Sequence, residues 1–344
     1  MRLLIVTQKV DQRDPILGFF HRWLLEFAKQ CESVIVICLE QGQHELPAIV
    51  RVHSLGKEDH VSRFTYLYRF YLHIWHERKN YDAVFVHMNP IYVVLAGFVW
   101  KLLHKRVSLW YTHKSVDWKL KIAEKFVGTI FSASQESFRL PTPKVLVTGH
   151  GIDTDYYVAD RSKRHSSGVI QLLTTGRVAP VKHIDLIIRS VHKLIDAGTH
   201  IELTIVGDGV TPQDAAYVIE VKKLVQELGI QSSVHFIGSV SPSEILPYLQ
   251  RADFFINMST TGSLDKALLE AMACEVVTVS SNEAFKDLLS PYGLFIQHAT
   301  VEESVAVLER ALASDARAIG TSLRAHILAT HSLSHLIPLL ISRI

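Results

Sequence analysis

Short apolar strands alternate with amphipathic helices along the chain, and this alternation restricts the possible folds more than any other feature. In the first half, strands are predicted at 3–6, 34–38, 83–87, 107–111, 129–134 and 145–148, and helices at 16–30, 62–78, 91–104 and 115–126. In the second half, strands are predicted near Gln171, Leu203, Val234, Phe254, Val277 and Leu294. Strand–helix–strand units of this kind form doubly wound parallel sheets, so we expect an α/β protein.

The length of the chain and one polar segment predict two domains. A chain of 344 residues exceeds what one hydrophobic core normally supports. Residues 157–168 are polar and lack apolar periodicity, so they are interpreted as a linker. We expect Rossmann-like domains over 1–156 and 169–344, with the last helix a candidate to pack back on the N-terminal domain. Ligands would bind at the carboxyl ends of the strands, in a cleft between the domains.

The composition is that of an ordinary globular protein, with 48% hydrophobic and 20% charged residues. Cys31, Cys38 and Cys274 lack CxxC spacing, which predicts small buried side chains and neither a disulfide framework nor a metal site. The N-terminus begins with a strand pattern instead of a signal peptide, and the longest apolar stretch, 91–100, is too short to span a bilayer. We therefore expect a cytoplasmic protein.

Positive charge is concentrated in the first half. Residues 1–155 hold 20 Lys and Arg against 15 Asp and Glu, whereas residues 156–344 hold 16 against 19. The excess lies in segment 60–79, which mixes aromatic and basic residues, and in 101–106. Such helices suit an anionic membrane surface, here the inner face of the cell membrane, or pack on a core with a solvated basic side. Nucleic acid is not expected, because the excess is modest and no binding motif accompanies it.

The loop 175–182, with the sequence TGRVAPVK, carries two cations between a predicted strand and a predicted helix. A helix N-terminus has unpartnered N–H groups and a partial positive charge, both of which favour an anion. Arg177 can bind two phosphate oxygens with its planar fork, and Lys182 acts as a mobile point charge. The loop, including Gly176, is therefore a candidate diphosphate site, and a solvated basic loop is the alternative.

Five segments in order resemble glycosyltransferases of the GT-B fold, and glycosyltransferase family 4 in particular. They are GHGIDTDYY at 149–157, TGRVAPVKHID at 175–185, IVGDGV at 205–210, VHFIGSVSPSEI at 234–245 and LLEAMAC at 268–274. The resemblance implies two Rossmann-like domains and transfer, with retention, of a sugar from a UDP- or GDP-sugar without a metal or other cofactor. It implies a glycan or lipid-linked acceptor, and it gives Arg177 and Lys182 the donor diphosphate and a catalytic role on the leaving group.

The resemblance also implies donor-binding residues around one departure from the family pattern. Glu270 matches the second of two glutamates separated by seven residues, which binds ribose hydroxyls, but the first position holds Gly262. Asp265 and Lys266 lie between them as replacements for the donor sugar or phosphate, although Asp265 could simply cap the next helix. Backbone N–H groups after Gly262 could form an anion-binding concavity. This loop adds Gly262, Ser263, Leu264, Asp265 and Lys266 to the predicted donor site.

In the first domain, the resemblance implies that His113 and Gly18 lie near the donor. His113 ends a predicted strand, and the family has a histidine there beside the donor sugar, so His113 is assigned a catalytic role. Gly18 follows the first strand, where the family brings glycine backbone close to the phosphates, although the usual run of glycines is missing.

Several weaker signals receive structural interpretations. Asp153 and Asp155 form a D-x-D motif at the domain boundary, where capping or hinge hydrogen bonds are expected instead of a metal. The segment 207–209 is expected to be a turn, because its aspartate would repel an anion. Glu275 and Val277 replace the family's usual turn Gly and Pro, which concerns turn geometry. The role of His150 is open.

The sequence leaves the base, the sugar and the acceptor undetermined, together with two alternative functions. A nucleotide-sugar epimerase of the same fold would act on the donor with no acceptor. A non-catalytic sugar-nucleotide-binding or membrane-binding protein is motivated by the glycine at position 262.

Overall fold

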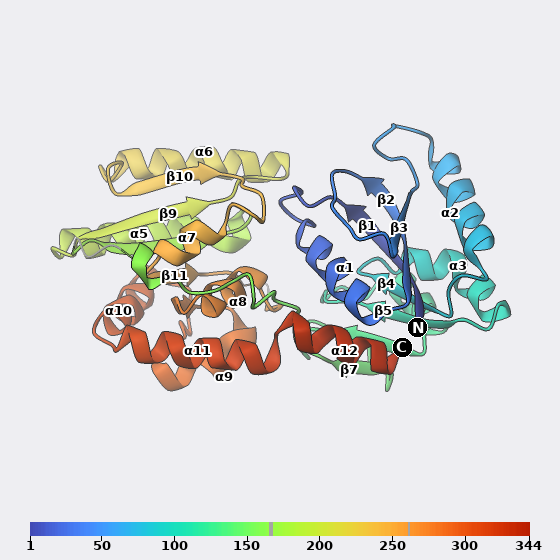
Figure 1. The fold of residues 1–344 in the computed structure, drawn as a ribbon. Coiled ribbons are helices and arrows are strands. Elements are labelled where there is room, and N and C mark those ends of the chain that lie inside the picture. The colour runs from blue at the N-terminus through green and yellow to red at the C-terminus, as the bar shows by residue number, and fades with distance from the viewer. Residues whose placement is uncertain (165–167, 261) are drawn as a thin grey trace. The chain divides into compact units, whose positions relative to one another are not determined.

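The structure is a computed structural model that describes residues 1–164, 168–260 and 262–344 (Figure 1). Its contacts divide the chain into an N-terminal unit, Met1–Asp153 with His331–Ile344, and a C-terminal unit, Thr154–Thr330. The division therefore follows Asp153 instead of residue 156. The terminal segment belongs to the N-terminal unit because α12 (Leu333–Arg343) packs against α1 (Phe19–Gln30).

The N-terminal unit contains a seven-stranded parallel sheet in the order β3-β2-β1-β4-β5-β6-β7. The strands are β1 (Arg2–Val10), β2 (Ser33–Gln41), β3 (Val50–Ser54), β4 (Ala83–His87), β5 (Arg106–Trp110), β6 (Thr129–Ser132) and β7 (Val145–Val147). Strand β3 was not predicted. It lies at the sheet edge and has only one buried residue, Val50, so its sequence lacks the apolar run of the central strands.

Helices cover both faces of this sheet. Helices α2 (Arg63–Glu77), α3 (Ile91–Leu102) and α4 (Trp118–Glu124) share a core with Val84 and Val86 of β4. Side chains alternate across a strand, so Phe85 points to the other face, where its ring lies 5.4 Å from that of Phe27 of α1. In Figure 1, α1 and α2 accordingly lie on opposite sides of these strands.

Gly151, in the segment that resembles the glycosyltransferase pattern, is required by packing against α1 and α12. A Cβ at this position would lie 2.8 Å from atoms of Leu333, Leu336 and Trp23. The carbonyl of Gly151 also accepts a hydrogen bond from the Trp23 indole at 3.2 Å. The glycine therefore lets the chain pass close to both helices at the end of the N-terminal sheet domain.

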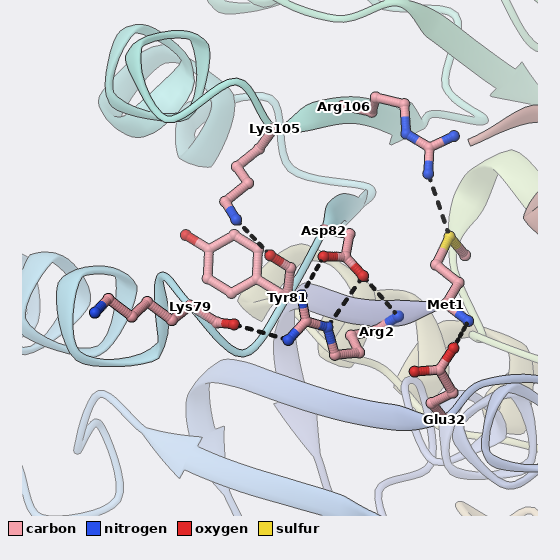
Figure 2. A network of polar contacts seen from close by, with 8 residues as sticks. All are labelled: Met1, Arg2, Glu32, Lys79, Tyr81, Asp82, Lys105 and Arg106. Atoms are coloured by element: carbon pink, nitrogen blue, oxygen red, sulfur yellow. Dashed lines mark hydrogen bonds and ion pairs between the residues drawn. The ribbon is translucent and has the colours of Figure 1, made fainter.

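The amino edge of the same sheet is held by a polar network, shown in Figure 2. Arg2 of β1 forms a two-pronged contact with Asp82, with N···O distances of 2.5 and 3.1 Å. The hydrogen bond from Arg2 keeps the pKa of the Asp82 carboxyl below its usual range. Lys105 donates to the carbonyl of Tyr81 at 2.5 Å. Arg2 begins β1, and Tyr81, Asp82 and Lys105 precede β4 and β5, so the network lies at the edge opposite to the carboxyl ends of the strands and has a structural role.

The C-terminal unit contains a five-stranded parallel sheet in the order β10-β9-β8-β11-β12. Its strands are β8 (Ile170–Thr175), β9 (Ile201–Val206), β10 (Val234–Gly238), β11 (Phe254–Asn257) and β12 (Val277–Ser280). Its helices are α5 (Ile184–Asp196), α6 (Pro212–Glu227), α7 (Leu246–Arg251), α8 (Lys266–Ala273), α9 (Lys286–Leu289), α10 (Val301–Leu312) and α11 (Ala316–Thr330).

The strand predicted near Leu294 is wrong. Gly293 has a left-handed φ of 69°, and Leu294 N–H donates to the carbonyl of Leu289, so this residue still belongs to the end of a helical turn. Only one bridge, between Ser280 and Phe295, follows before the polar segment 297–300. The pairing with β12 therefore stops at an isolated bridge and does not extend into a strand.

The described part of the predicted linker, 157–164, packs on the C-terminal unit instead of crossing as an open segment. Arg161 Nε donates to the Glu275 carboxylate at 3.0 Å, and Arg164 donates to the carbonyls of Cys274 and Glu275 at 3.2 and 2.9 Å. Glu275 itself has a φ of 58°, so the turn after α8 keeps a left-handed residue without glycine. The basic residues of this segment stabilise that turn. Residues 165–167 of the predicted linker lie outside the described residues.

All three cysteines are buried and unpaired, as predicted for small core side chains. Burial raises the pKa of Cys31 to about 11 and the pKa of Cys38 and of Cys274 to about 12, so these thiols are poor nucleophiles at neutral pH. Within the described residues, no helix combines the length and the apolar character needed to cross a bilayer.

Because His73 is partly buried, we expect the protein to lose stability in mild acid. Its ring stacks on that of His53 at 4.5 Å, and burial, with the nearby His53, His76 and Arg69, lowers its pKa to about 4. An unfolded histidine titrates near pH 6.5, so between about pH 6.5 and 4 only the unfolded chain binds this proton. The free energy of unfolding should therefore fall as the pH falls through this window, as measured by urea unfolding.

The His73→Gln variant should show a weaker pH dependence than the wild type between pH 6.5 and 5, above the range where carboxylates titrate. The exposed His298 provides the matched control, because His298→Gln should keep the wild-type slope. An unchanged slope in His73→Gln would contradict this assignment.

Candidate functional site

The candidate diphosphate loop is fixed by backbone hydrogen bonds to the loop that follows β9. Gly176 N–H donates to the carbonyl of Val206 at 2.9 Å, and Val178 N–H donates to that of Asp208 at 3.0 Å. Gly176 and Gly207 have φ values of 120° and 138°, in the region that favours glycine. A Cβ on Gly207 would lie 1.8 Å from the carbonyl oxygen of Gly176. The segment 207–209 therefore packs against the diphosphate loop and helps to fix its position.

The loop ends in a short 3₁₀ turn, Pro180–Lys182, and α5 begins at Ile184. His183 joins the two with left-handed angles, φ 50° and ψ 45°, and makes no side-chain cap hydrogen bond. Asp185 lies in the first turn of α5 and accepts a hydrogen bond from the Tyr217 hydroxyl at 2.5 Å. The N-terminus of this helix therefore already carries one carboxylate, which sequence analysis did not consider.

Lys182 is not an isolated cation, because its ammonium forms an ion pair with the Asp265 carboxylate. Both side chains are more than four-fifths buried. Asn257 Nδ2 donates to the same Oδ2 of Asp265 at 3.1 Å, and Ala267 N–H donates to Oδ1 at 3.2 Å. Asp265 thus caps α8 and orients Lys182 at the same time.

Arg177 is more loosely held. Its side chain is 46% exposed, and its contact with Asp214 is long, 3.8 Å between Nη1 and Oδ2. Burial opposes ionisation of Asp214, but hydrogen bonds from Thr211 and from the backbone of Val210 keep its pKa below the usual value. Asp214 is therefore a carboxylate committed to capping α6, and the guanidinium of Arg177 can reach a ligand without breaking a short ion pair.

A small hollow is lined by both Arg177 and Lys182. Its empty volume is about 250 Å³, part of it open to solvent, and it lies where β8, β9 and β11 end. The lining residues are Thr174, Thr175, Gly176, Arg177, Lys182, Ile184, Ile205, Val206, Asn257 and Met258. This position agrees with the rule that parallel sheets bind ligands at the carboxyl ends of their strands.

Helix α8 carries the second group of predicted donor residues. Glu270 pairs with Lys266, one turn earlier, at 3.2 Å between Oε1 and Nζ. Gly262 is buried and has a left-handed φ of 62°, and the carbonyl of Ser263 accepts a hydrogen bond from Asn282 at 2.8 Å. Leu264 completes the described part of this loop, and residue 261 lies outside the described residues. The structure therefore places a left-handed glycine where the family pattern has its first glutamate.

The structure thus brings several predicted residues together and leaves others apart. Gly176, Arg177 and Lys182 line one hollow, and Asp265 contacts Lys182 directly. Sequence analysis missed Asn257, which orients Asp265. The available signal was its place as the polar last residue of an otherwise apolar strand, FFIN.

His113 and Gly18 belong to the N-terminal unit, so their part in the donor site stays a prediction. His113 is exposed just after β5, and its Nδ1 accepts a hydrogen bond from Ser115 N–H at 3.1 Å. Gly18 caps α1 with a φ of −59°, a conformation open to any residue. The backbone angles therefore do not explain why residue 18 is glycine.

The remaining signals have structural partners. Asp153 accepts a hydrogen bond from Arg22 at 2.9 Å, beside the division between the two units. His150 is buried, with its ring 6.1 Å from that of Trp110, and its backbone N–H donates to Nδ1 of His331 at 3.0 Å. In the part of the chain that the structure describes, no three His, Cys, Asp or Glu side chains gather as a metal site would require.

In comparisons with known proteins, the segment that holds the C-terminal sheet is similar to one family. Residues 170–314 match the model of the family described as Glycosyl transferases group 1. Alpha-monoglucosyldiacylglycerol synthase of Streptococcus pneumoniae is 27% identical over 145 residues, covering 42% of this chain and 32% of that protein. The GPI3 subunit of phosphatidylinositol N-acetylglucosaminyltransferase of Saccharomyces cerevisiae is 27% identical over 123 residues, 36% of this chain and 26% of that protein. The matches span about a third or less of these relatives.

Solved structures match over nearly the whole chain. Anabaena Alr3699/HepE, solved in complex with UDP, has a TM-score of 0.80 at 15% identity and covers 99% of both chains. Sucrose-phosphate synthase of Thermosynechococcus elongatus has a TM-score of 0.77 at 14% identity, covering 99% of this chain and 98% of that one. The predicted GT-B fold and the resemblance to group 1 glycosyltransferases are confirmed.

Proposed function

We propose that the chain is a glycosyltransferase that moves a sugar from a nucleoside-diphosphate sugar to a hydroxyl group of a lipid or a growing glycan. The observation that carries this proposal is the hollow at the ends of β8 and β11, which holds both Arg177 and Lys182. A diphosphate is the ligand that two convergent cations and a glycine-lined loop suit best. The match to the group 1 glycosyltransferase family over this same sheet supports the assignment.

The proposed reaction breaks the bond between the sugar's anomeric carbon and the diphosphate, and forms a bond to the acceptor oxygen with retained configuration. Negative charge develops on the departing phosphate, where Arg177 and Lys182 would stabilise it. The acceptor proton would pass to that phosphate. At an effective dielectric near 20, a unit pair at about 4 Å interacts by about 4 kcal/mol, enough to accelerate the step strongly.

The other predicted residues complete the donor site in this proposal. Glu270 accepts the ribose hydroxyl protons, since a carboxylate has lone pairs beyond the one that faces Lys266. The loop from Gly262 to Leu264 would face the phosphate or the sugar. Asp265 and Lys266, which pair with Lys182 and Glu270 respectively, would lie beside it in the donor site. His113, in the N-terminal unit, supplies a hydrogen bond to a sugar hydroxyl. No metal or other cofactor takes part.

A lipid acceptor is the preferred form of the proposal. The Streptococcus relative is named as a synthase of a glucosylated diacylglycerol, and the yeast relative as a transferase on phosphatidylinositol. Because the acceptor is a lipid, the proposed location of the protein is the cytoplasm, peripheral to the inner face of the cell membrane. UDP is the first nucleotide to test, because it occupies the Anabaena structure.

The test is a transfer assay with defined probes. The full chain is incubated with UDP-glucose, UDP-N-acetylglucosamine or GDP-mannose, with and without diacylglycerol or phosphatidylinositol in detergent micelles. We expect a glycolipid by mass spectrometry and release of the nucleoside diphosphate. UDP or GDP should also raise the melting temperature, because a ligand of the native state stabilises it. No binding and no product would contradict the proposal.

The same assay separates the alternative that Gly262 motivates. A non-catalytic sugar-nucleotide-binding protein would bind UDP or GDP but give no product with any acceptor, including soluble oligosaccharides. An epimer formed from the donor alone would instead indicate an epimerase of the same fold.

A further inference from the structure

Helix α2 carries two apolar stripes where packing on a core requires one. Phe70 and Ile74 are buried against the N-terminal sheet. The second stripe recurs at intervals of three and four residues on the outer side. It consists of Phe64, Leu67, Tyr68, Tyr71 and Trp75, with Phe64, Tyr68 and Trp75 exposed by 85, 67 and 55%. All three rings stay exposed, although the Arg78 guanidinium lies over that of Trp75.

Helix α3 extends this stripe. The Tyr71 hydroxyl donates to the carbonyl of Leu95 at 2.7 Å, which joins the outer sides of the two helices. One and two turns further along α3, Phe98 and Leu102 are 61 and 63% exposed. We call these seven residues, the five of α2 with Phe98 and Leu102, the outer aromatic surface. A cluster of large exposed apolar side chains marks an interaction site in a globular protein.

Basic residues flank the outer aromatic surface, and the nearby Asp59 is paired with Arg69 of α2, 3.7 Å between Oδ2 and Nη1. Arg63 and Arg78 lie at the two ends of α2, and Lys101 lies between Phe98 and Leu102 in the sequence of α3. The guanidinium of Arg78 lies 4.3 Å from the centre of the Trp75 ring. The sequences of α2 and α3 contain one acid, Glu77, which is buried with Arg51 and His53.

Aromatic rings interleaved with cations are the composition of a bilayer-contacting surface. The rings suit the boundary between headgroups and acyl chains, and the long basic side chains reach the anionic headgroups. A second copy of this chain would instead bring like charges together across an apolar contact. We propose that the outer aromatic surface docks the N-terminal unit on an anionic lipid bilayer, with its rings at the depth of the headgroups.

Vesicle co-sedimentation of the full chain tests this docking. The chain should sediment with phosphatidylcholine vesicles containing 30% phosphatidylglycerol, far less with pure phosphatidylcholine, and less again in 0.5 M NaCl. Each basic residue near such a surface contributes about fivefold to partitioning. Arg63→Gln with Lys101→Gln should therefore weaken binding by more than tenfold. Phe64→Ser with Tyr68→Ser should weaken it at low salt as well. Ile219→Ser with Lys223→Gln, on exposed positions of α6, is the matched control and should bind normally.

Tryptophan quenching reports the contact without a destabilising change. Trp23, Trp100 and Trp110 are buried, so Trp75 and Trp118 are the exposed tryptophans. Doxyl-labelled lipids should quench the wild type and the Trp118→Phe variant, and should quench Trp75→Phe much less. Equal binding to neutral vesicles, or equal quenching in Trp75→Phe, would overturn the proposal. So would a stable dimer that the outer-surface substitutions dissociate. UDP binding without vesicles should be unchanged in every variant, which separates this inference from the donor site.

Discussion

Replacing Lys182 by alanine is expected to lower the rate of sugar transfer about 100- to 1000-fold, the size of effect seen when one preorganised charge stabiliser is removed. UDP affinity should also fall by at least about tenfold, because a charge-assisted hydrogen bond contributes roughly 1.5 to 3 kcal/mol. The loss is amplified by Asp265, whose carboxylate keeps its place at the cap of α8 but loses its cation and then repels the diphosphate. Initial rates and calorimetry with UDP measure the two effects.

Two further variants make this prediction specific. Lys182→Ala with Asp265→Asn should bind UDP more tightly than Lys182→Ala alone, because asparagine still caps the helix and the repulsive charge is gone. Lys193→Ala removes a lysine from α5 that pairs with Glu302 at the surface, and it should leave turnover and UDP binding unchanged. Unchanged UDP affinity in both Lys182→Ala and Arg177→Ala would exclude the diphosphate assignment.

The local sequence was sufficient to predict those elements that a periodic pattern of apolar residues specifies. The alternating apolar strands and helices predicted both parallel sheets, and the loop with Arg177 and Lys182 was correctly placed between β8 and α5. Strand β3 was missed, because an edge strand buries too little apolar surface to stand out in the sequence. The false strand at Leu294 had an apolar run but follows a left-handed glycine that ends a helical turn.

The partners of the site residues could not be predicted in the same way. Lys182 and Asp265 are separated by 83 positions, and Arg177 lies in the loop after β8 whereas Asp214 lies in the first turn of α6. Such pairs depend on strand order and on how deep each loop is buried, neither of which periodicity reports. The polar segment 157–164 shows the same limit, because its arginines find carbonyls and a carboxylate near residue 275 that no local pattern connects to them.

Replacing Gly207 by alanine is expected to destabilise the C-terminal unit by about 3 kcal/mol or more and to abolish UDP binding. The residue combines a φ of 138°, which disfavours any side chain, with a Cβ position 1.8 Å from the carbonyl oxygen of Gly176. Strain and overpacking each cost roughly 1 to 3 kcal/mol. The loop of Arg177 and Lys182 has to move to relieve the contact. Urea unfolding and UDP calorimetry measure the two losses.

Gly198→Ala is the matched control, because Gly198 also has a positive φ, 89°, but nothing lies within 4 Å of its Cβ position. It should lose only about 1 to 2 kcal/mol of stability, because alanine is strained at this φ, and it should bind UDP normally. A Gly207→Ala protein that stays folded but does not bind UDP would still support the coupling between the two loops. In that case the loop of Arg177 and Lys182 would have moved to make room for the added methyl group. Equal losses in the two variants, with UDP binding retained in both, would show that the turn at 207–209 does not position the diphosphate loop.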